Sequence, residues 1–277
     1  MTAPAPETLL AAVERSPQAA AAHDRTAWVS LFTDDGRVED PVGSRPHVGH
    51  AAIGRFFDTF IGPREITFHR HLDVVAGTVV LRDLELEVAM GPDVTMHIPA
   101  FLRYDLREDL PEDPREDLRE INGDWRIARL RAYWELPAMV RQFLRSGTRA
   151  MSPALRLSRG LLGNQGPRGA VGFMAGFRRP GARHQERVAG ILDAAARGDR
   201  TTAARGLSPT AAITAGDDEP LDIGELVERL AGARPTKTIS AGPTVVVAVD
   251  SGPRRGIVFA DVTGPATTVD RLSYFPA

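Results

Sequence analysis

The stretch WVSLFTDDGRVEDPVGS, residues 28–44, decides the fold, because signals for a helix, a strand and a turn follow one another within it. Its first apolar residues continue an alanine-rich helical pattern that starts near residue 7. A short extended stretch runs through Val38, and Pro41-Val42-Gly43-Ser44 predicts a turn. The stretch therefore predicts a helix that leads into a strand, with Asp40 where the strand meets the turn.

The segment upstream predicts two short helices rather than one. The helical pattern of residues 7–33 is interrupted near Ser16-Pro17, and we expect it to restart near Asp24, a favourable helix-capping residue. Downstream of the turn, a third helix is expected from about His50 to Phe60.

From Ile66 onward, the pattern changes to apolar runs with β-branched residues. These runs predict strands at Ile66–Val75, Thr78–Met90, Val94–Leu106 and Trp125–Trp134. Three helices followed by a meander of strands predict an α+β domain, with the helices on one face of a curved antiparallel sheet. Such a sheet would wrap around a pocket.

A strongly acidic segment separates the last two predicted strands. Residues 105–120 hold eight acidic residues, three arginines and two prolines. Because so much charge cannot be buried at low cost, we expect a long, exposed hairpin loop here.

The segment 137–183 has the opposite charge. It contains nine arginines and no acidic residue, interleaved with leucines, methionines and phenylalanines, and it becomes glycine-rich toward its end. We interpret it as a linker with one or two amphipathic helices. Such a segment can pack on its own protein, or it can bind an anionic membrane surface or an acidic partner. Binding of nucleic acid is not expected, because no recognition motif accompanies the arginines.

The second half repeats the first in a weakened form. Three pairs of similar segments occur in the same order, namely 24–26 with 199–201, 53–60 with 223–230, and 129–134 with 271–275. We therefore expect three parts: a first domain at 1–136, the linker at 137–183, and a shorter copy of the first domain at 184–277. The copies are expected to form an intramolecular pseudo-dimer that buries their Val- and Ile-rich strand faces.

Residues 28–44 resemble the ketosteroid isomerase and SnoaL-like members of the nuclear-transport-factor-2-like superfamily. The most specific part is VEDPVGS at 38–44, and the match continues through 47–57 and ends at 131–134. The resemblance covers most of the first 136 residues. It implies a cone-shaped sheet with three helices packed on it, present in tandem here if the second half is a degenerate copy.

In that family, the aspartate that matches Asp40 is the general base that moves a proton between carbons beside a steroid enone. A carboxylate next to an apolar pocket is poorly solvated, which raises its basicity. Asp40 is thus the candidate catalytic residue. The other interpretation is an aspartate that binds local backbone N–H groups in the turn before Pro41.

The donors of the family's oxyanion hole are missing from this sequence. The developing enolate needs hydrogen-bond donors, which the family supplies from a tyrosine and a protonated aspartate. The tyrosine position falls at or near Ser16 and the aspartate position at Ala100, while Phe32 and Phe57 replace supporting tyrosines. Loss of one donor can cost on the order of a hundredfold in rate. Steroid isomerisation by the usual mechanism is therefore expected to be inefficient.

The pocket itself is expected to be apolar. Alternating strand positions predict that six side chains point inward, namely Ile66, Phe68, Ile98, Ala100, Leu130 and Trp134. The resemblance implies that the indole N–H of Trp134 reaches Asp40 or a ligand, although a plain core role is the alternative.

No metal or cofactor is expected. His69 and His71 have the spacing of two ligands on one strand face, but this face points away from the pocket and no third ligand is identifiable. In the second copy, the position matching Asp40 falls near Ala215, so a second active site is not expected.

The composition is typical of a globular protein that acts in the cytoplasm. The chain has 277 residues, 43% of them hydrophobic, a net charge of −2 and no cysteine. Thiolate metal sites, disulfides and cysteine nucleophiles are thereby excluded. No apolar run reaches the roughly 18 residues of a membrane span.

Three functions agree with this sequence. The first is an isomerase, cyclase or related lyase acting on a polycyclic or isoprenoid-like hydrophobic molecule, with Asp40 as the proton shuttle. The second is a non-catalytic carrier or sensor in which Asp40 and Trp134 anchor the polar end of such a ligand. The third is a tandem-domain scaffold. Fold alone does not choose among them.

Overall fold

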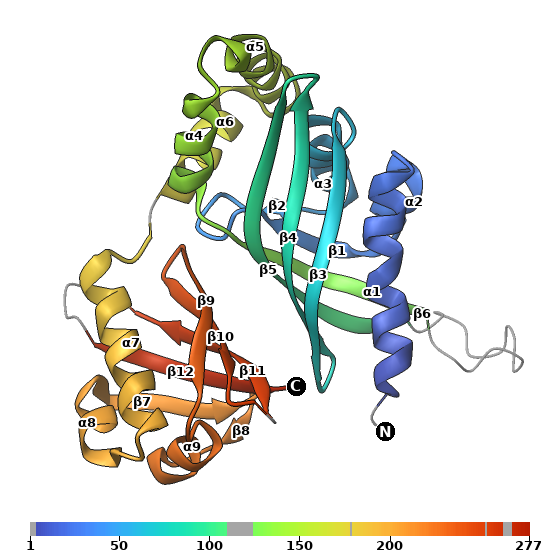
Figure 1. Ribbon diagram of the computed structural model, residues 1–277. Helices are drawn as coiled ribbons and strands as arrows, with labels where there is room; N and C mark the ends of the chain where they lie inside the picture. The colour runs from blue at the N-terminus through green and yellow to red at the C-terminus, as the bar shows by residue number, and fades with distance from the viewer. Residues whose placement is uncertain (1–3, 110–123, 178, 253, 263–267) are drawn as a thin grey trace, which may run out of the picture.

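The computed structural model describes residues 4–109, 124–177, 179–252, 254–262 and 268–277. It contains two six-stranded sheets, each with its own helices, so the class is α+β with the fold in tandem (Figure 1).

The first half comprises α1 (Pro6–Ala21), α2 (Arg25–Ser30), β1 (Phe32–Glu39), β2 (His47–Val48), α3 (His50–Phe56), a π-helical turn η1 (Phe57–Ile61), β3 (Glu65–Ala76), β4 (Val79–Gly91), β5 (Val94–Asp109) and β6 (Asp124–Tyr133). The strand order is β2-β1-β6-β5-β4-β3. Strands β3 to β6 form the expected meander, but β1 runs parallel to β6, so the sheet is mixed and not purely antiparallel. The difference arises because β1 reaches its neighbour through a long crossover and not through a hairpin.

The first helix does not break where expected. Helix α1 continues through Pro17 to Ala21 and is packed on the core by Leu9 and Val13. This packing outweighs the loss of the hydrogen bond that a proline inside a helix causes. The restart at Asp24 is confirmed, because its carboxylate accepts the backbone N–H of Ala27 at 2.9 Å and caps α2.

The acidic segment divides at the limit of the described residues. Its first part, through Asp109, belongs to strand β5, and β6 begins at Asp124. The loop was expected at residues 105–120, so its first five residues are a correction, and residues 110–120 lie outside the described residues.

The basic segment is helical. It forms α4 (Leu136–Arg145), η2 (Gly147–Ala150), α5 (Met151–Gly160), η3 (Leu161–Gln165), α6 (Gly166–Met174) and η4 (Ala175–Phe177). Figure 1 shows these helices, in green to yellow, beside one end of the first sheet. Met139 and Phe173 pack against the core of the first half, and the backbone N–H of Arg45 donates to the carbonyl of Gly172 at 3.1 Å. The segment thus contacts its own protein.

The second half comprises α7 (Ala182–Ala196), α8 (Arg200–Arg205), β7 (Leu207–Ala215), β8 (Glu219–Pro220), α9 (Ile223–Arg229), β9 (Arg234–Ala241), β10 (Thr244–Asp250), β11 (Arg255–Asp261) and β12 (Val269–Pro276). Its strand order, β8-β7-β12-β11-β10-β9, repeats that of the first sheet position by position. Strand β7 is also parallel to β12, as β1 is to β6.

The repeat extends to individual side chains. Arg25 lies over Gly54, where an added Cβ would come within 2.2 Å of its guanidinium, and its Nε donates to Asp58 at 2.9 Å. The second half places an arginine over a glycine in the same way and joins it to an acid at 2.8 Å, using Arg200, Gly224 and Glu228. Asp199 caps α8 as Asp24 caps α2.

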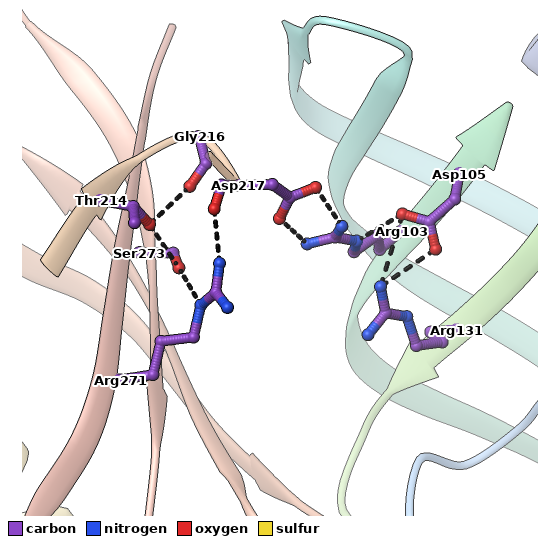
Figure 2. Close-up of polar contacts among 8 residues, drawn as sticks. All are labelled: Arg103, Asp105, Arg131, Thr214, Gly216, Asp217, Arg271 and Ser273. Atoms are coloured by element: carbon purple, nitrogen blue, oxygen red, sulfur yellow. Dashed lines mark hydrogen bonds and ion pairs between the residues drawn. The ribbon is translucent and has the colours of Figure 1, made fainter. Parts of the chain in front are cut away.

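The two sheets pack on each other through a shared apolar cluster. The first sheet, with the turn that follows β1, contributes Val42, Val74, Val79, Leu81, Phe101 and Tyr133. The second sheet contributes Ile239, Ala241, Val246, Ala248, Ile257, Phe259 and Phe275. Two cations cross the junction. Lys237 of β9 donates to the carbonyls of Leu84 and Ala100 at 2.9 Å each, and Arg103 of β5 binds Asp217 (Figure 2).

Candidate functional site

The parallel pairing of β1 with β6 positions Asp40. Val38 is paired with Leu130 and Glu39 with Arg131, so the two strands end at the same edge of the sheet. Asp40 directly follows β1, and Trp134 directly follows β6. The indole Nε1 of Trp134 donates a hydrogen bond to Oδ1 of Asp40 at 2.5 Å.

Asp40 and Trp134 line a cavity of about 110 Å³. Arg64 is the third polar residue in its wall. The others are apolar, namely Phe56, Phe60, Ile61, Ile66, Leu86, Val88, Met90, Met96, Ile98, Met139, Leu157 and Phe173. A carboxylate in such surroundings has little water to stabilise its charge.

The surroundings change the acidity of Asp40. Burial raises its pKa from 3.8 to about 6, while the hydrogen bond from Trp134 acts in the opposite direction by stabilising the carboxylate. At neutral pH the group is still mostly ionised, and it is a stronger base than an ordinary aspartate. This combination suits transfer of a proton to and from carbon.

The sequence-predicted residues separate into two groups. The structure brings Ile66, Ile98 and Trp134 together with Asp40 at the cavity wall. The other predicted ligand contacts lie in the packed core of the same half and are not part of this wall, namely Phe32, Phe57, Phe68, Ala100 and Leu130. Ser16 is buried on α1, where its hydroxyl accepts the indole N–H of Trp28 at 3.1 Å.

Arg64 is a site residue that the sequence analysis missed. Its Nη1 donates to the carbonyls of Thr59 and Phe60, at 2.7 and 2.9 Å, at the end of the helical turn η1. Burial lowers the pKa of its guanidinium. The sequence could have indicated this residue, because Gly62-Pro63 marks the end of a helix and a cation just after a helix end can bind its last carbonyls.

The basic segment forms part of the cavity wall. Met139, Leu157 and Phe173 come from α4, α5 and α6 respectively, and the Phe173 ring stacks on Phe60 with centroids 5.2 Å apart. The resulting volume is below the roughly 300–1,000 Å³ of most ligand pockets. A polycyclic ligand therefore requires these three side chains to move.

The histidines of β3 do not converge. His69 contacts Glu87 at 2.8 Å, and His71 lies 3.6 Å from a different carboxylate, Asp83. Within the described ranges, no group of three or more potential ligands is arranged to hold a metal ion.

Ala215 occupies the matching place in the second half. Ile213 pairs with Leu272 as Val38 pairs with Leu130, so the residue two positions later corresponds to Asp40. An alanine there offers no acid or base.

None of the helices in the described part of the chain has the length and apolarity needed to cross a membrane.

Comparison with known proteins agrees with this geometry. Residues 13–109, which include β1, Asp40 and the strands of the cavity wall, match the SnoaL-like domain family. The first half of the chain thus contains a SnoaL-like domain of the nuclear-transport-factor-2-like class.

Several solved structures resemble about half of the chain. A Δ5-3-ketosteroid isomerase from a Mycobacterium species is 26% identical over 48% of this chain and 96% of its own, with a TM-score of 0.34. A Mycobacterium tuberculosis protein in complex with estradiol-17β-hemisuccinate is 24% identical over 47% and 95%, with a TM-score of 0.38. An epoxide hydrolase of the LEH-like type from M. tuberculosis is 16% identical over 53% and 97%, with a TM-score of 0.40.

Proposed function

We propose that the SnoaL-like domain binds a hydrophobic small molecule in the cavity and that Asp40 transfers a proton on it. The observation that carries the proposal is a carboxylate with a pKa raised to about 6 in a wall formed mainly by apolar side chains. In the step we envisage, Asp40 accepts a proton from a carbon beside a carbonyl. The electron pair of that C–H bond becomes a C=C bond, and the π pair of the carbonyl moves to its oxygen, which gives an enolate. In an isomerisation, the enolate collapses and the protonated Asp40 returns the proton to another carbon of the conjugated system. In a cyclisation, the enolate carbon instead attacks a second carbonyl carbon of the same molecule, and Asp40 returns the proton to the alkoxide oxygen formed there.

Arg64 is the candidate donor for the charge that develops on oxygen. Neither Ser16 nor Ala100 supplies a donor to this cavity. Arg64 lies in the cavity wall and makes its two hydrogen bonds through Nη1. Its remaining N–H groups would serve in place of the usual steroid oxyanion pair.

A non-catalytic ligand carrier is the second candidate. It is favoured by the short hydrogen bond from Trp134, which already occupies one oxygen of Asp40. In this function, the two side chains hold the polar end of a ligand and no bond changes.

One experiment separates the two functions. The protein is titrated with a phenolic steroid and a panel of planar polycyclic ligands by tryptophan fluorescence, and enone isomerisation is assayed alongside. Asp40→Asn is compared with Asp34→Asn, which removes an exposed carboxylate from β1, the strand that Asp40 follows. Turnover that is lost only in Asp40→Asn supports proton transfer. Binding without turnover supports the carrier, and no binding to any ligand contradicts both.

The surface of the segment from α4 to η4 favours an additional interaction with an anionic lipid bilayer. Among the described residues, every large hydrophobic side chain that is exposed, apart from Val48, belongs to this segment: Leu144, Met151, Leu155, Leu162, Val171, Met174 and Phe177. The same segment is rich in arginine and contains no acid. Apolar side chains beside cations are the pattern of helices that lie on anionic membranes.

Co-sedimentation with vesicles tests this interaction. Vesicles of phosphatidylglycerol and phosphatidylcholine should bind the protein, and pure phosphatidylcholine vesicles should bind it much less. Leu155→Asp should weaken binding by roughly tenfold, because it places a charge among the lipid-facing side chains. Thr201→Asp adds the same charge on α8 and should have little effect. Equal binding by both variants would contradict the assignment of this surface.

A further inference from the structure

A second hollow adjoins the Asp40 cavity. It has a volume of about 290 Å³ and lies between the turn after β1, helix α3 and the segment from η3 to α6. Phe60 and Phe173, the stacked pair, belong to the walls of both hollows. A molecule that passes beside these two rings would therefore reach from one hollow into the other.

The second hollow is lined by cations. These cations are Arg45, Arg55 and Arg168, and the wall includes no aspartate or glutamate. His47 lies beside them in the same wall. In the described part of the chain, none of the three guanidinium groups forms an ion pair, whereas Arg25 and Arg103 each do. All three arginines are exposed residues, so water screens their mutual repulsion in part. An anion bound in the hollow would neutralise more of their charge.

The hollow is also built into the fold. Ser44, another wall residue, is buried and its hydroxyl has no hydrogen-bond partner among the described residues. Arg45 is held by its backbone hydrogen bond to Gly172, where an added Cβ would come within 2.7 Å of the Arg45 Cβ. Docking of α6 therefore holds the backbone of Arg45 beside α6, which itself carries Arg168.

His47 reports the electrostatic field of this site. Burial, followed by the charges of Arg55 and Arg45, lowers the pKa of its imidazole to about 4. A positive field strong enough to act on a neighbouring imidazole would equally attract an anionic group.

We infer that this basic hollow binds the phosphate or carboxylate head of an amphiphilic ligand whose apolar part occupies the Asp40 cavity. The inference rests on the proposed function for the apolar part and adds a substrate class, an anionic amphiphile. Planar guanidinium groups suit the oxygens of such heads because each can form two parallel hydrogen bonds.

Paired probes test the inference by calorimetry. Dodecyl phosphate and dodecanol share an alkyl chain and differ in the head, and inorganic pyrophosphate supplies a head alone. Dodecyl phosphate should bind at least tenfold more tightly than dodecanol. The double variant Arg55→Gln, Arg168→Gln should abolish this preference. Arg37→Gln removes an exposed arginine of β1 that lies outside the hollow and should preserve it.

The outcomes separate failure of the inference from failure of the proposed function. Equal binding of the two alkyl probes, unchanged in the double variant, would overturn the inference and leave the apolar cavity intact. Binding of pyrophosphate that depends on Arg55 and Arg168, without binding of dodecanol, would support the basic site and contradict the apolar one. In the wild type, NMR should show that the pKa of His47 rises when dodecyl phosphate or pyrophosphate binds. A purely structural role of the arginines would not produce this rise.

A third arm identifies the source of the head group. Vesicles containing phosphatidic acid present the same phosphate in a bilayer. Lower affinity of the double variant for these vesicles supports uptake from a membrane. Loss of affinity for dodecyl phosphate alone supports a free amphiphile.

Discussion

Arg103 of β5 and Asp217 of the turn after β7 form a two-pronged ion pair between the two halves, with nitrogen–oxygen distances of 2.8 and 2.5 Å (Figure 2). Asp105 accepts a further hydrogen bond from Arg103 at 2.8 Å and also binds Arg131. The pair lies beside the apolar cluster, and the Arg103 side chain is only 11% exposed. A charge so poorly solvated depends on its partner.

A double-mutant cycle should reveal this dependence. Arg103→Met and Asp217→Asn should each destabilise the protein, and the double variant should be less affected than the sum of the two. We expect a coupling free energy of about 1–3 kcal/mol from urea unfolding. Additivity within about 0.3 kcal/mol would show that the pair does not hold the halves together.

Lys237, the only lysine of the chain, should contribute more to the free energy of unfolding than an exposed cation does. It donates to two carbonyls of the first sheet and pairs with Asp83, which is buried. Lys237→Met should cost about 3 kcal/mol in the free energy of unfolding, because Asp83 loses its counterion. Adding Asp83→Asn should restore part of the loss, and Arg234→Met, at an exposed position of β9, should change little. No rescue by Asp83→Asn would contradict this explanation.

Asp40 should make the protein less stable as the pH rises. Its folded-state pKa of about 6 exceeds the ordinary 3.8, so the native state binds more protons than the unfolded state between these values. Stability is therefore lost from pH 4 to pH 6, by up to roughly 3 kcal/mol. Asp40→Asn should be more stable than the wild type at pH 7 and nearly equal to it at pH 4. Chemical denaturation across this range measures the difference, and a constant difference would contradict the raised pKa.

Displacement of α6 should open the cavity. Gly172 has no space for a side chain against Arg45, whereas nothing lies within 4 Å of a Cβ added at Gly160. Gly172→Leu should thus raise the binding rate of a hydrophobic dye and cost about 1–3 kcal/mol of stability. Gly160→Leu, in the same helical segment, is the control. Identical dye kinetics in the two variants would show that α6 does not close the cavity.

Local patterns predict strands β3 to β6 to within a few residues, because alternation of apolar side chains is typical of a half-buried strand. The two-residue strand β2 was not predicted. The parallel pairing of β1 with β6 was missed because it joins residues about ninety positions apart. The unbroken α1 was missed for a related reason, since packing of Val13 compensates for Pro17.

The site shows the same division. Asp40 and Trp134 follow from the family resemblance, and their contact is a matter of strand register. The cavity contacts of Leu157 and Phe173 depend on where distant helices pack, which amphipathicity alone does not specify. Arg64 was not predicted because it lies in a short connection between η1 and β3, where no periodic pattern of apolar residues indicates which side chains face the cavity.

The face-to-face sheets also have a consequence for stoichiometry. One face of each sheet is packed against the other sheet, and Ala215 stands in the second half where the first half has Asp40. In the part of the chain that the structure describes, only the first copy therefore has an acid at this position of the fold. Titration of a ligand into the Asp40 cavity should follow a simple hyperbola with one molecule bound per chain, without the cooperativity that two equivalent, coupled sites would permit.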